Sequence, residues 1–234
     1  MSPHIDDIFL SLYSFITSDF RNERIVAVNA FSTTDHLNQV PKEPYSASSI
    51  RMNEELRFAK HLSTKGIDYR PVFLGLQDAS LELAPGARES WRNHHKLDQW
   101  GEDLVRKRFD VGSDMVIRCL IRQFGSSHVY FPVGIGHVDH VFLGRVGRTA
   151  EEHNVSFYMD VPYSSDYPGL KEIKRSFGLK DFQTKRKRLN HKERMYLFSK
   201  LFPSQSNPET LDRIRKAGCL GECVFSEPTA HCDD

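Results

Sequence analysis

The chain has 234 residues, 39% of them hydrophobic, and its 32 basic side chains nearly balance 31 acidic ones for a formal net charge of +1. This length suits one α/β domain with a substantial core, and the balanced charge argues against a nucleic-acid or membrane-surface binder. No apolar run approaches the length of a membrane-spanning helix, and no basic leader precedes an apolar stretch. We therefore expect a cytoplasmic protein.

The first third of the chain predicts alternating helices and strands. The run at residues 8–16 is apolar nearly all round and predicts a buried helix, and the β-branched start of residues 25–31 predicts a strand. Apolar side chains recur at helical spacing within residues 48–66, after a serine and before a closing glycine. A second strand is expected at residues 69–75, where a proline indicates the margin of the sheet.

The pattern continues after a polar connection at residues 75–94. Further elements are expected in this order: helices at about 95–109 and 114–124, a strand at 126–132, a helix that includes 144–153, and a strand and its exit at 155–163. Strands that alternate with helices predict a Rossmann-like α/β fold, with a mostly parallel sheet and helices on both faces.

A basic stretch follows at residues 171–194 and contains TKRKR at residues 184–188. One interpretation is a patch that binds the phosphate of a phosphorylated or nucleotide-linked substrate. The other is a solvated helix or loop, which the balanced overall charge favours.

Two short polar clusters carry the chemistry. The first is His4-Ile5-Asp6-Asp7 and the second is His137-Val138-Asp139-His140, and each lies where a strand or expected strand gives way to a helix. Carboxyl ends of parallel strands meet in one crevice, so the two loops are able to form a single site. Two histidines and one carboxylate suit a catalytic zinc with an open position for water, and the remaining groups suit an acid and a base.

Each cluster also has a purely structural interpretation. Asp6 or Asp7 is able to accept backbone N–H groups at the start of the first helix, and Asp139 is able to cap the later one. Short motifs of this kind often occur by chance, so neither cluster alone establishes a catalytic site.

Longer stretches around these clusters resemble one family. SPHIDD before an apolar helix and GHVDHV much later resemble the motifs of the PIG-L/LmbE zinc-dependent de-N-acetylases. RMNEELRFAKHL is similar to the family's Arg-x-x-Glu helix, FLGLQDA to its Leu-Gly-x-x-Asp strand exit, and FYMDVPY to a tyrosine-rich exit in a bacterial subgroup. The resemblance implies an LmbE-like catalytic core at residues 1–165 and a helical, basic part of the same domain at residues 166–234.

The resemblance also implies a metal site. His4 and Asp7 of the first motif and His140 of the second would be the ligands of one zinc ion. Iron or cobalt fits the same ligand set, because geometry and availability decide which ion occupies such a site.

Other residues receive roles in the same way. The resemblance makes Asp6 the general base, and His137 the group that stabilises the tetrahedral intermediate or acts as acid, with Asp139 orienting it. Arg51 matches an arginine near the sugar, and Asp78 is a weaker candidate for contact with the substrate.

The chain departs from the family pattern in three places. Ile5 and Ile8 replace the common proline and glutamate of the first motif, and Ile135 stands where some members carry an assisting tyrosine. Tyr130 or Tyr163 is a candidate replacement for that tyrosine. The strand that normally precedes the first motif is reduced to three residues, so we expect a truncated first strand.

The leading hypothesis is a zinc-dependent hydrolase that removes an N-acetyl group from an N-acetylated amino sugar or sugar conjugate. The alternatives are an amidase that acts on a non-sugar amide and a non-catalytic carbohydrate-binding or scaffold protein. The expected partner is a small molecule and neither nucleic acid nor a membrane, and the sequence leaves self-association into a homo-oligomer open.

Overall fold

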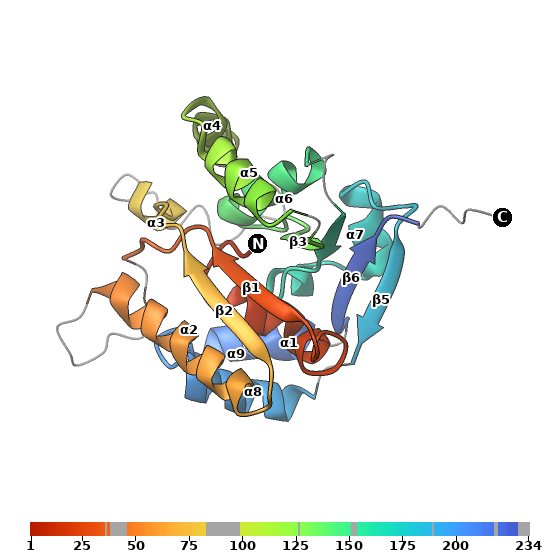
Figure 1. Cartoon of the computed structure of the whole chain (residues 1–234). Helices are drawn as coiled ribbons and strands as arrows, with labels where there is room; N and C mark the ends of the chain where they lie inside the picture. Colours follow the sequence, from red (N-terminus) through yellow and green to blue (C-terminus); the bar gives the residue numbers. More distant parts are fainter. Residues whose placement is uncertain are drawn as a thin grey trace.

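The computed structural model describes residues 1–35, 37, 46–82, 99–125, 127–150, 154–188, 190–217 and 220–228. In these parts of the chain, helices surround two sheets that lie next to each other (Figure 1). α2 packs on β2, α6 on β3 and β4, and α1 on β6. The expected mixed α/β fold with parallel strands is confirmed. No helix of the described residues is long and apolar enough to cross a membrane.

All four strands expected from the sequence are present. The strands of the described residues are β1 (Arg24–Asn29), β2 (Asp68–Phe73), β3 (Val129–Pro132), β4 (Val155–Tyr158), β5 (Gln183–Lys187) and β6 (Glu222–Ser226). β1 and β2 pair in parallel, and the second sheet has the order β3-β4-β6-β5. β3 and β4 are parallel to each other, whereas β6 runs antiparallel to both β4 and β5.

The helices follow the predicted order along the chain. They are α1 (Asp7–Ser18), α2 (Ala47–Ser63), α3 (Ala79–Glu82), α4 (Gln99–Asp110), α5 (Ser113–Gln123), α6 (Val138–Arg148), the 3-10 helix η2 (Tyr163–Asp166), α7 (Leu170–Ser176), α8 (His191–Leu201) and α9 (Pro208–Ala217). α1 buries nearly all of its side chains, as its uniformly apolar sequence predicts. Ser46 begins α2 and its side chain accepts the N–H of Ser49.

The C-terminal part contains strands that its sequence did not predict. The basic stretch at 171–194, expected to be a helix or loop, includes the edge strand β5, and residues 166–234 add β6 as well as helices. The side chains of β5 are nearly all exposed, so its composition carries no alternation that indicates a strand. Its strand conformation depends on pairing with β6, which is largely buried.

Three residues at the start of the chain join the two sheets. Ser2 forms a parallel bridge with Asn29. The Ser2 N–H donates to the Val28 carbonyl at 2.7 Å, and the Ser2 carbonyl accepts the Ala30 N–H at 2.9 Å. The Met1 amine donates to the Tyr130 carbonyl in β3 at 2.6 Å. The expected short first strand is thus present as one bridge between the carboxyl ends of β1 and β3.

The amino ends of β1 and β3 are separated by an apolar cavity of about 520 Å³. Its lining includes Ile8, Leu12 and Ile16 from α1 and Val26 and Val129 from the two strands. The short bridge therefore closes the gap between the sheets only at the end where the two polar clusters lie.

The helix that carries the first polar cluster is held by the C-terminal part. The Arg194 guanidinium of α8 donates to the Phe9 carbonyl of α1 at 2.5 Å, and the Glu222 carboxylate of β6 accepts the Ser14 N–H at 2.8 Å. Arg194 and Glu222 also form a buried ion pair with each other. α1, α8 and β6 therefore belong to one packed unit.

Candidate metal centre and active site

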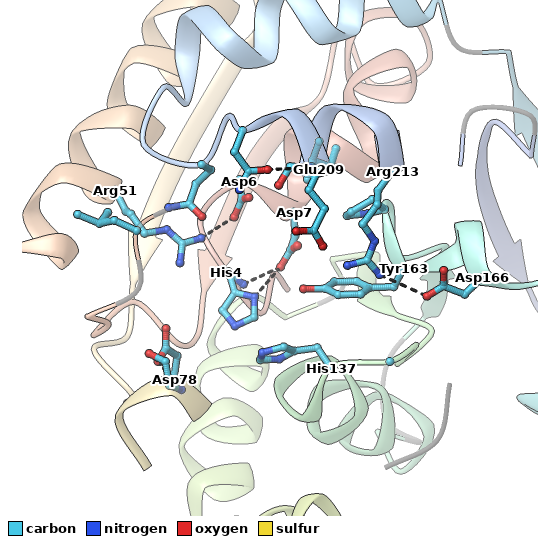
Figure 2. A pocket seen from close by; sticks show the side chains of 18 residues that line it. His4, Asp6, Asp7, Arg51, Asp78, His137, Tyr163, Asp166, Glu209 and Arg213 are labelled. Atoms are coloured by element: carbon cyan, nitrogen blue, oxygen red, sulfur yellow. Dashed lines mark hydrogen bonds and ion pairs between the residues drawn. The ribbon is translucent and has the colours of Figure 1, made fainter. Parts of the chain in front are cut away.

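The two polar clusters meet at one cavity of about 280 Å³ (Figure 2). The first cluster lies at the start of α1, and the second lies between β3 and α6. The first cluster follows Ser2, which pairs in parallel with β1, and the second follows β3, which pairs in parallel with β4. The carboxyl ends of parallel strands commonly carry such sites. The structure thus brings together side chains that are more than 130 positions apart in the sequence.

Three buried ligand atoms lie close together, and both distances from Asp7 match those around a tetrahedral metal ion. Asp7 Oδ2 lies 3.3 Å from His4 Nδ1 and 3.3 Å from His140 Nε2. Nitrogen and oxygen ligands about 2.0–2.2 Å from zinc in a tetrahedron lie roughly 3.3 Å from one another. His140 Nε2 is also buried without a hydrogen-bond partner. The donor types, their spacing and this unpaired nitrogen fit a divalent ion held by His4, Asp7 and His140.

A second possible ligand group shares His4 with the first. His4, His137 and Asp139 also lie close enough together to hold an ion. His4 Nε2, however, already contacts Asp139 Oδ2 at 2.7 Å. Because this contact leaves Nδ1 of His4 facing Asp7, the geometry favours the group with Asp7 and His140.

Asp160 fixes the orientation of His140. Its Oδ1 lies 2.6 Å from His140 Nδ1, and its Oδ2 accepts the N–H groups of Gly134 and Ile135 at 2.9 and 3.1 Å. A carboxylate on the far nitrogen of a ligating histidine sets its tautomer and ring orientation. Sequence reasoning did not single out Asp160, although an aspartate directly after the predicted strand, in FYMDVPY, was an available signal.

Asp139 supports His4 more directly than it supports His137. One carboxylate oxygen bonds His4, and the same oxygen is 3.6 Å from His137 Nδ1. The other oxygen pairs with Arg108 of α4, whose guanidinium lies over the Phe31 ring at 4.2 Å. The sequence gave no indication of Arg108, because nothing local connects it with Asp139.

The buried charges hold both histidine ligands in their cationic form when no ion is bound. Burial lowers the pKa of His4, but hydrogen bonds and charges from Asp139 and Asp7 raise it to about 9. Burial opposes protonation of His140 too, yet the charges of Asp7 and Asp160 raise its pKa to about 10. Burial raises the pKa of Asp7, but the two histidines hold it well below its usual range. A metal ion that binds here must displace protons, since its ligands have to be deprotonated.

His137 lies at the start of α6 and is the N-cap of that helix. Its Nδ1 accepts the Asp139 N–H at 3.2 Å, so the alternative in which Asp139 itself caps the helix is wrong. Asp139 lies inside the first turn, where its carboxylate is held by His4 and Arg108. Burial lowers the pKa of His137 well below its usual value, so the ring is neutral. With Nδ1 as acceptor, the proton of a neutral imidazole is on Nε2.

Asp6 faces the cavity instead of capping α1. It is the N-cap residue of that helix but makes no side-chain capping bond, and the Arg51 guanidinium donates to its Oδ1 at 2.6 Å. Asp78 also lines the cavity, and its carboxylate accepts the Ser80 N–H at 2.9 Å. Arg51 and Asp78, both predicted as substrate contacts, thus lie at the cavity, with Arg51 paired to Asp6.

The Arg-x-x-Glu spacing on α2 connects two sides of the site. Arg51 reaches Asp6, whereas Glu54 accepts both the N–H and the hydroxyl of Ser204 at 2.7 Å. Gln205, next to Ser204, lines the cavity. One turn of α2 therefore fixes both the first polar cluster and the loop between α8 and α9.

Residues from the last third of the chain form one wall of the cavity, and of these the sequence indicated only Tyr163. This wall comprises Tyr163 and Asp166 of η2 and Glu209 and Arg213 of α9 (Figure 2). Tyr130, the other tyrosine considered as a replacement, lines the apolar cavity between β1 and β3 instead. The described residues of the basic stretch at 171–194 do not line the polar cavity.

The fold is similar to that of several solved structures, three of which are α/β deacetylases. The deacetylase–bog complex of the teicoplanin biosynthesis pathway has a TM-score of 0.59 and 18% identity, over 96% of this chain and 94% of that chain. The A40926 pseudoaglycone deacetylase Dbv21 has a TM-score of 0.56 and 18% identity, over 96% of this chain and 94% of that chain. The zinc-inhibited form of teicoplanin deacetylase Orf2 has a TM-score of 0.58 and 17% identity, over 96% of this chain and 95% of that chain. The expected α/β fold is therefore the fold of these three structures.

Sequence comparison adds no closer relative. No protein-family model and no curated protein matches the chain. The likeness to the three deacetylases is therefore a likeness of fold, and function rests on the side chains of the site.

Proposed function

We propose that this chain is a metal-dependent deacetylase that hydrolyses the N-acetyl group of an N-acetylated amino sugar within a sugar conjugate. The observation that carries the proposal is the buried group His4, Asp7 and His140, in which Asp7 Oδ2 lies 3.3 Å from a ring nitrogen of each histidine, beside an open polar cavity. The deacetylase neighbours support the reaction class, and the neighbours named for teicoplanin and A40926 support a glycosylated substrate.

The resident ion is proposed to be zinc, although iron or cobalt suits the same ligands. When bound, the ion polarises the acetamide carbonyl and makes water a better nucleophile near neutral pH. His4, Asp7 and His140 would hold it, and Asp160 and Asp139 would keep the two imidazole rings in position.

Asp6 is the proposed general base. Its carboxylate faces the cavity and its Oδ1 is paired with Arg51. A carboxylate oxygen of Asp6 takes one proton from the attacking water while the water oxygen bonds to the carbonyl carbon. When the carbon–nitrogen bond breaks, the same carboxyl returns this proton to the leaving amine, so that acetate and a free amino sugar result.

His137 is proposed to be a neutral hydrogen-bond donor. Its Nδ1 accepts a backbone N–H, and its lowered pKa disfavours the cationic form. We therefore assign to the Nε2–H the role of a donor to negative charge on the substrate oxygen. The acid role considered for His137 is the weaker of the two, and Asp6 supplies the proton in its place.

The first experiment measures the metal content of the purified protein beside two variants. We expect close to one metal ion per chain in the parent and little in Asp7→Ala. The matched control is Asp68→Ala, which removes an exposed carboxylate that pairs with Arg24 and Arg70. It should retain the full metal content.

Activity is then assayed as acetate released from a panel of N-acetylated amino sugars, glycopeptide conjugates and non-sugar acetamides. Release from sugar conjugates by the metal-loaded parent supports the proposal. Release only from non-sugar amides would identify the amidase alternative. A parent that binds the ion and a sugar conjugate but releases no acetate would be the non-catalytic binding protein.

A further inference from the structure

The cavity beside the proposed metal group has more negative than positive side chains along its lining. In the described part of the chain, the charged groups that line it are the carboxylates of Asp6, Asp7, Asp78, Asp166 and Glu209 and the guanidiniums of Arg51 and Arg213. The lowered pKa of His137 keeps that ring neutral, and His4 and Asp7 would be ligands of the ion. The rest of a bound substrate therefore meets an acidic lining.

Both arginines of the lining are already occupied by carboxylates. Arg51 is buried, donates to Asp6 Oδ1 at 2.6 Å, and interacts with the charge of Asp78 as well. Arg213 donates to Asp166 Oδ2 at 3.3 Å. A phosphate group that enters this cavity would thus find no unpaired arginine or lysine among the described residues of the lining.

Glu209 differs from the other carboxylates of the lining because it has no partner. Among the described residues it forms neither a hydrogen bond nor an ion pair, whereas Asp78 accepts the Ser80 N–H at 2.9 Å and the Ser80 hydroxyl at 2.5 Å. Glu209 is exposed in the first turn of α9, and Figure 2 shows its carboxylate pointing into the cavity. This carboxylate is therefore available to a group of the substrate.

The position of Glu209 decides which part of a substrate it meets. The acetamide has to reach the buried ligands His4, Asp7 and His140, so the group linked to the sugar extends toward the exposed wall. An ammonium there forms a charge-assisted hydrogen bond with the carboxylate, which is stronger than a bond from a neutral hydroxyl, whereas a phosphate is repelled. A repulsive group in a site contributes to specificity as an attractive one does.

We propose that Glu209 selects amino-sugar conjugates that carry an ammonium group next to the acetylated sugar and rejects phosphorylated or nucleotide-linked ones. The carboxylate binds the ammonium through its charge and a hydrogen bond and exchanges no proton with the reacting acetamide. The basic stretch at 171–194, a candidate phosphate site from the sequence, takes no part, because its described residues do not line the cavity. The inference rests on the proposed deacetylase function and names its substrate class.

The test uses three glycosides of N-acetylglucosamine that differ only at the end of a two-carbon aglycone: 2-aminoethyl, 2-hydroxyethyl and 2-phosphoethyl. For acetate release by the metal-loaded parent, kcat/KM should be about fivefold higher for the aminoethyl than for the hydroxyethyl glycoside, as expected of one exposed ion pair. The phosphoethyl glycoside should have the lowest value. The preference should disappear in about 1 M salt, where exposed charges are screened over about 3 Å.

Three variants assign the preference to one side chain. Glu209→Gln keeps the size of the side chain and removes its charge, so the ratio of kcat/KM between the aminoethyl and hydroxyethyl glycosides should fall to about one. Glu209→Lys should reverse the order and favour the phosphoethyl glycoside. The matched control, Asp212→Asn, removes one negative charge from the same helix. Asp212 pairs with Arg215 and Lys216 and does not line the cavity, so the parent ratio should persist.

Two results would overturn the inference. One is a parent with equal kcat/KM for all three glycosides or with a preference for the phosphoethyl glycoside. The other is a preference for the ammonium that Glu209→Gln retains or that Asp212→Asn also loses, since it would then arise from the overall charge of the protein.

Failure of the deacetylase function gives a different result. A parent that releases no acetate from any acetamide would refute the reaction. Calorimetry with the same glycosides would still test the selectivity, which stands if the aminoethyl glycoside binds about fivefold more tightly than the hydroxyethyl glycoside in the parent and equally in Glu209→Gln, and falls if the two affinities are equal in the parent.

Discussion

The two sides of the polar cavity are built in different ways. The floor, defined as His4, Asp7, Asp139, His140 and Asp160, is buried, and each of its members contacts another member. The wall, defined as Tyr163, Asp166, Glu209 and Arg213, is partly exposed and includes one ion pair and one cation–π contact. A substitution in the floor should therefore lower metal affinity and the stability of the fold. A substitution in the wall should affect only the binding and turnover of the substrate.

The largest effect is expected at Arg108, the cation that compensates the floor. Arg108→Met leaves Asp139 buried without its guanidinium partner, which should destabilise the fold by about 3–5 kcal/mol. Urea unfolding measures this difference. Arg106→Met on the same helix removes an exposed guanidinium paired with Asp103 and should change stability by less than about 1 kcal/mol. Equal stabilities of the two variants would contradict the interlocked floor.

Glu55, a buried carboxylate outside the floor, should make the stability of the fold depend on pH in the opposite direction to the floor aspartates. Glu55 is fully buried, and the Tyr69 hydroxyl donates to one of its oxygens. Burial raises its pKa to about 8, opposite to the direction for Asp7 and Asp139, which cations stabilise. Burial is the largest cause of this raised pKa, and the negative charges of Asp6 and Asp7 add to it, whereas the hydrogen bond from Tyr69 opposes it.

The sign of the resulting pH dependence follows from this raised pKa. The folded protein binds the Glu55 proton more tightly than the unfolded chain, so the stabilisation is complete below about pH 4.5 and lost as pH rises through about 8. Glu55→Gln stays neutral and should lose less stability, by an amount on the order of 3 kcal/mol, when pH is raised from 5 to 9. Parallel stability–pH curves of parent and variant in urea titrations would refute this.

The next largest effect is expected on metal affinity, when the carboxylate that orients His140 is changed. Asp160→Asn keeps the size of the side chain but weakens its hold on His140 Nδ1, so metal affinity should fall about 10–100-fold. Competition with a chelator measures the affinity. Asp181→Asn, an exposed aspartate after α7, is the matched control and should leave it unchanged. An unaltered affinity in Asp160→Asn would mean that His140 is oriented by packing alone.

The sequence predicted the floor better than the wall for a physical reason. Each polar cluster follows a stretch of backbone that pairs in parallel with a neighbouring strand, the feature from which a shared site was predicted, and His4, Asp7 and His140 do lie together. The roles given to Asp6, His137 and Asp139 stay predictions. Arg108 was not predictable, because its partner Asp139 lies 31 positions away on another helix.

The C-terminal elements were harder to predict because their conformation depends on distant partners. β5 is a strand of five residues with no apolar alternation, and its backbone is fixed by β6, which lies more than thirty positions later. α9 reaches the cavity through Arg213, whose contacts with Tyr163 and Asp166 join segments about fifty positions apart. Local patterns contain no information on such pairs, whereas helix and strand periodicity in the first two thirds is local and was sufficient.

The smallest effect is expected in the wall. Arg213→Met removes the cation over the Tyr163 ring and the exposed pair with Asp166, interactions worth up to about 1 kcal/mol, so kcat/KM should fall about fivefold or less. Arg215→Met, which breaks a pair with Asp212 within the same helix, should leave kcat/KM at the parent value.

Metal content should not change in either arginine variant, since neither side chain contacts the floor, and the melting temperature should shift by no more than about 4 °C. A loss of metal in Arg213→Met would break the distinction between floor and wall, because it would show that α9 holds the ligands through Tyr163 and His140. A fall in kcat/KM alone would place Arg213 with the groups that position the tyrosine, and the difference from Arg215→Met would measure that contribution.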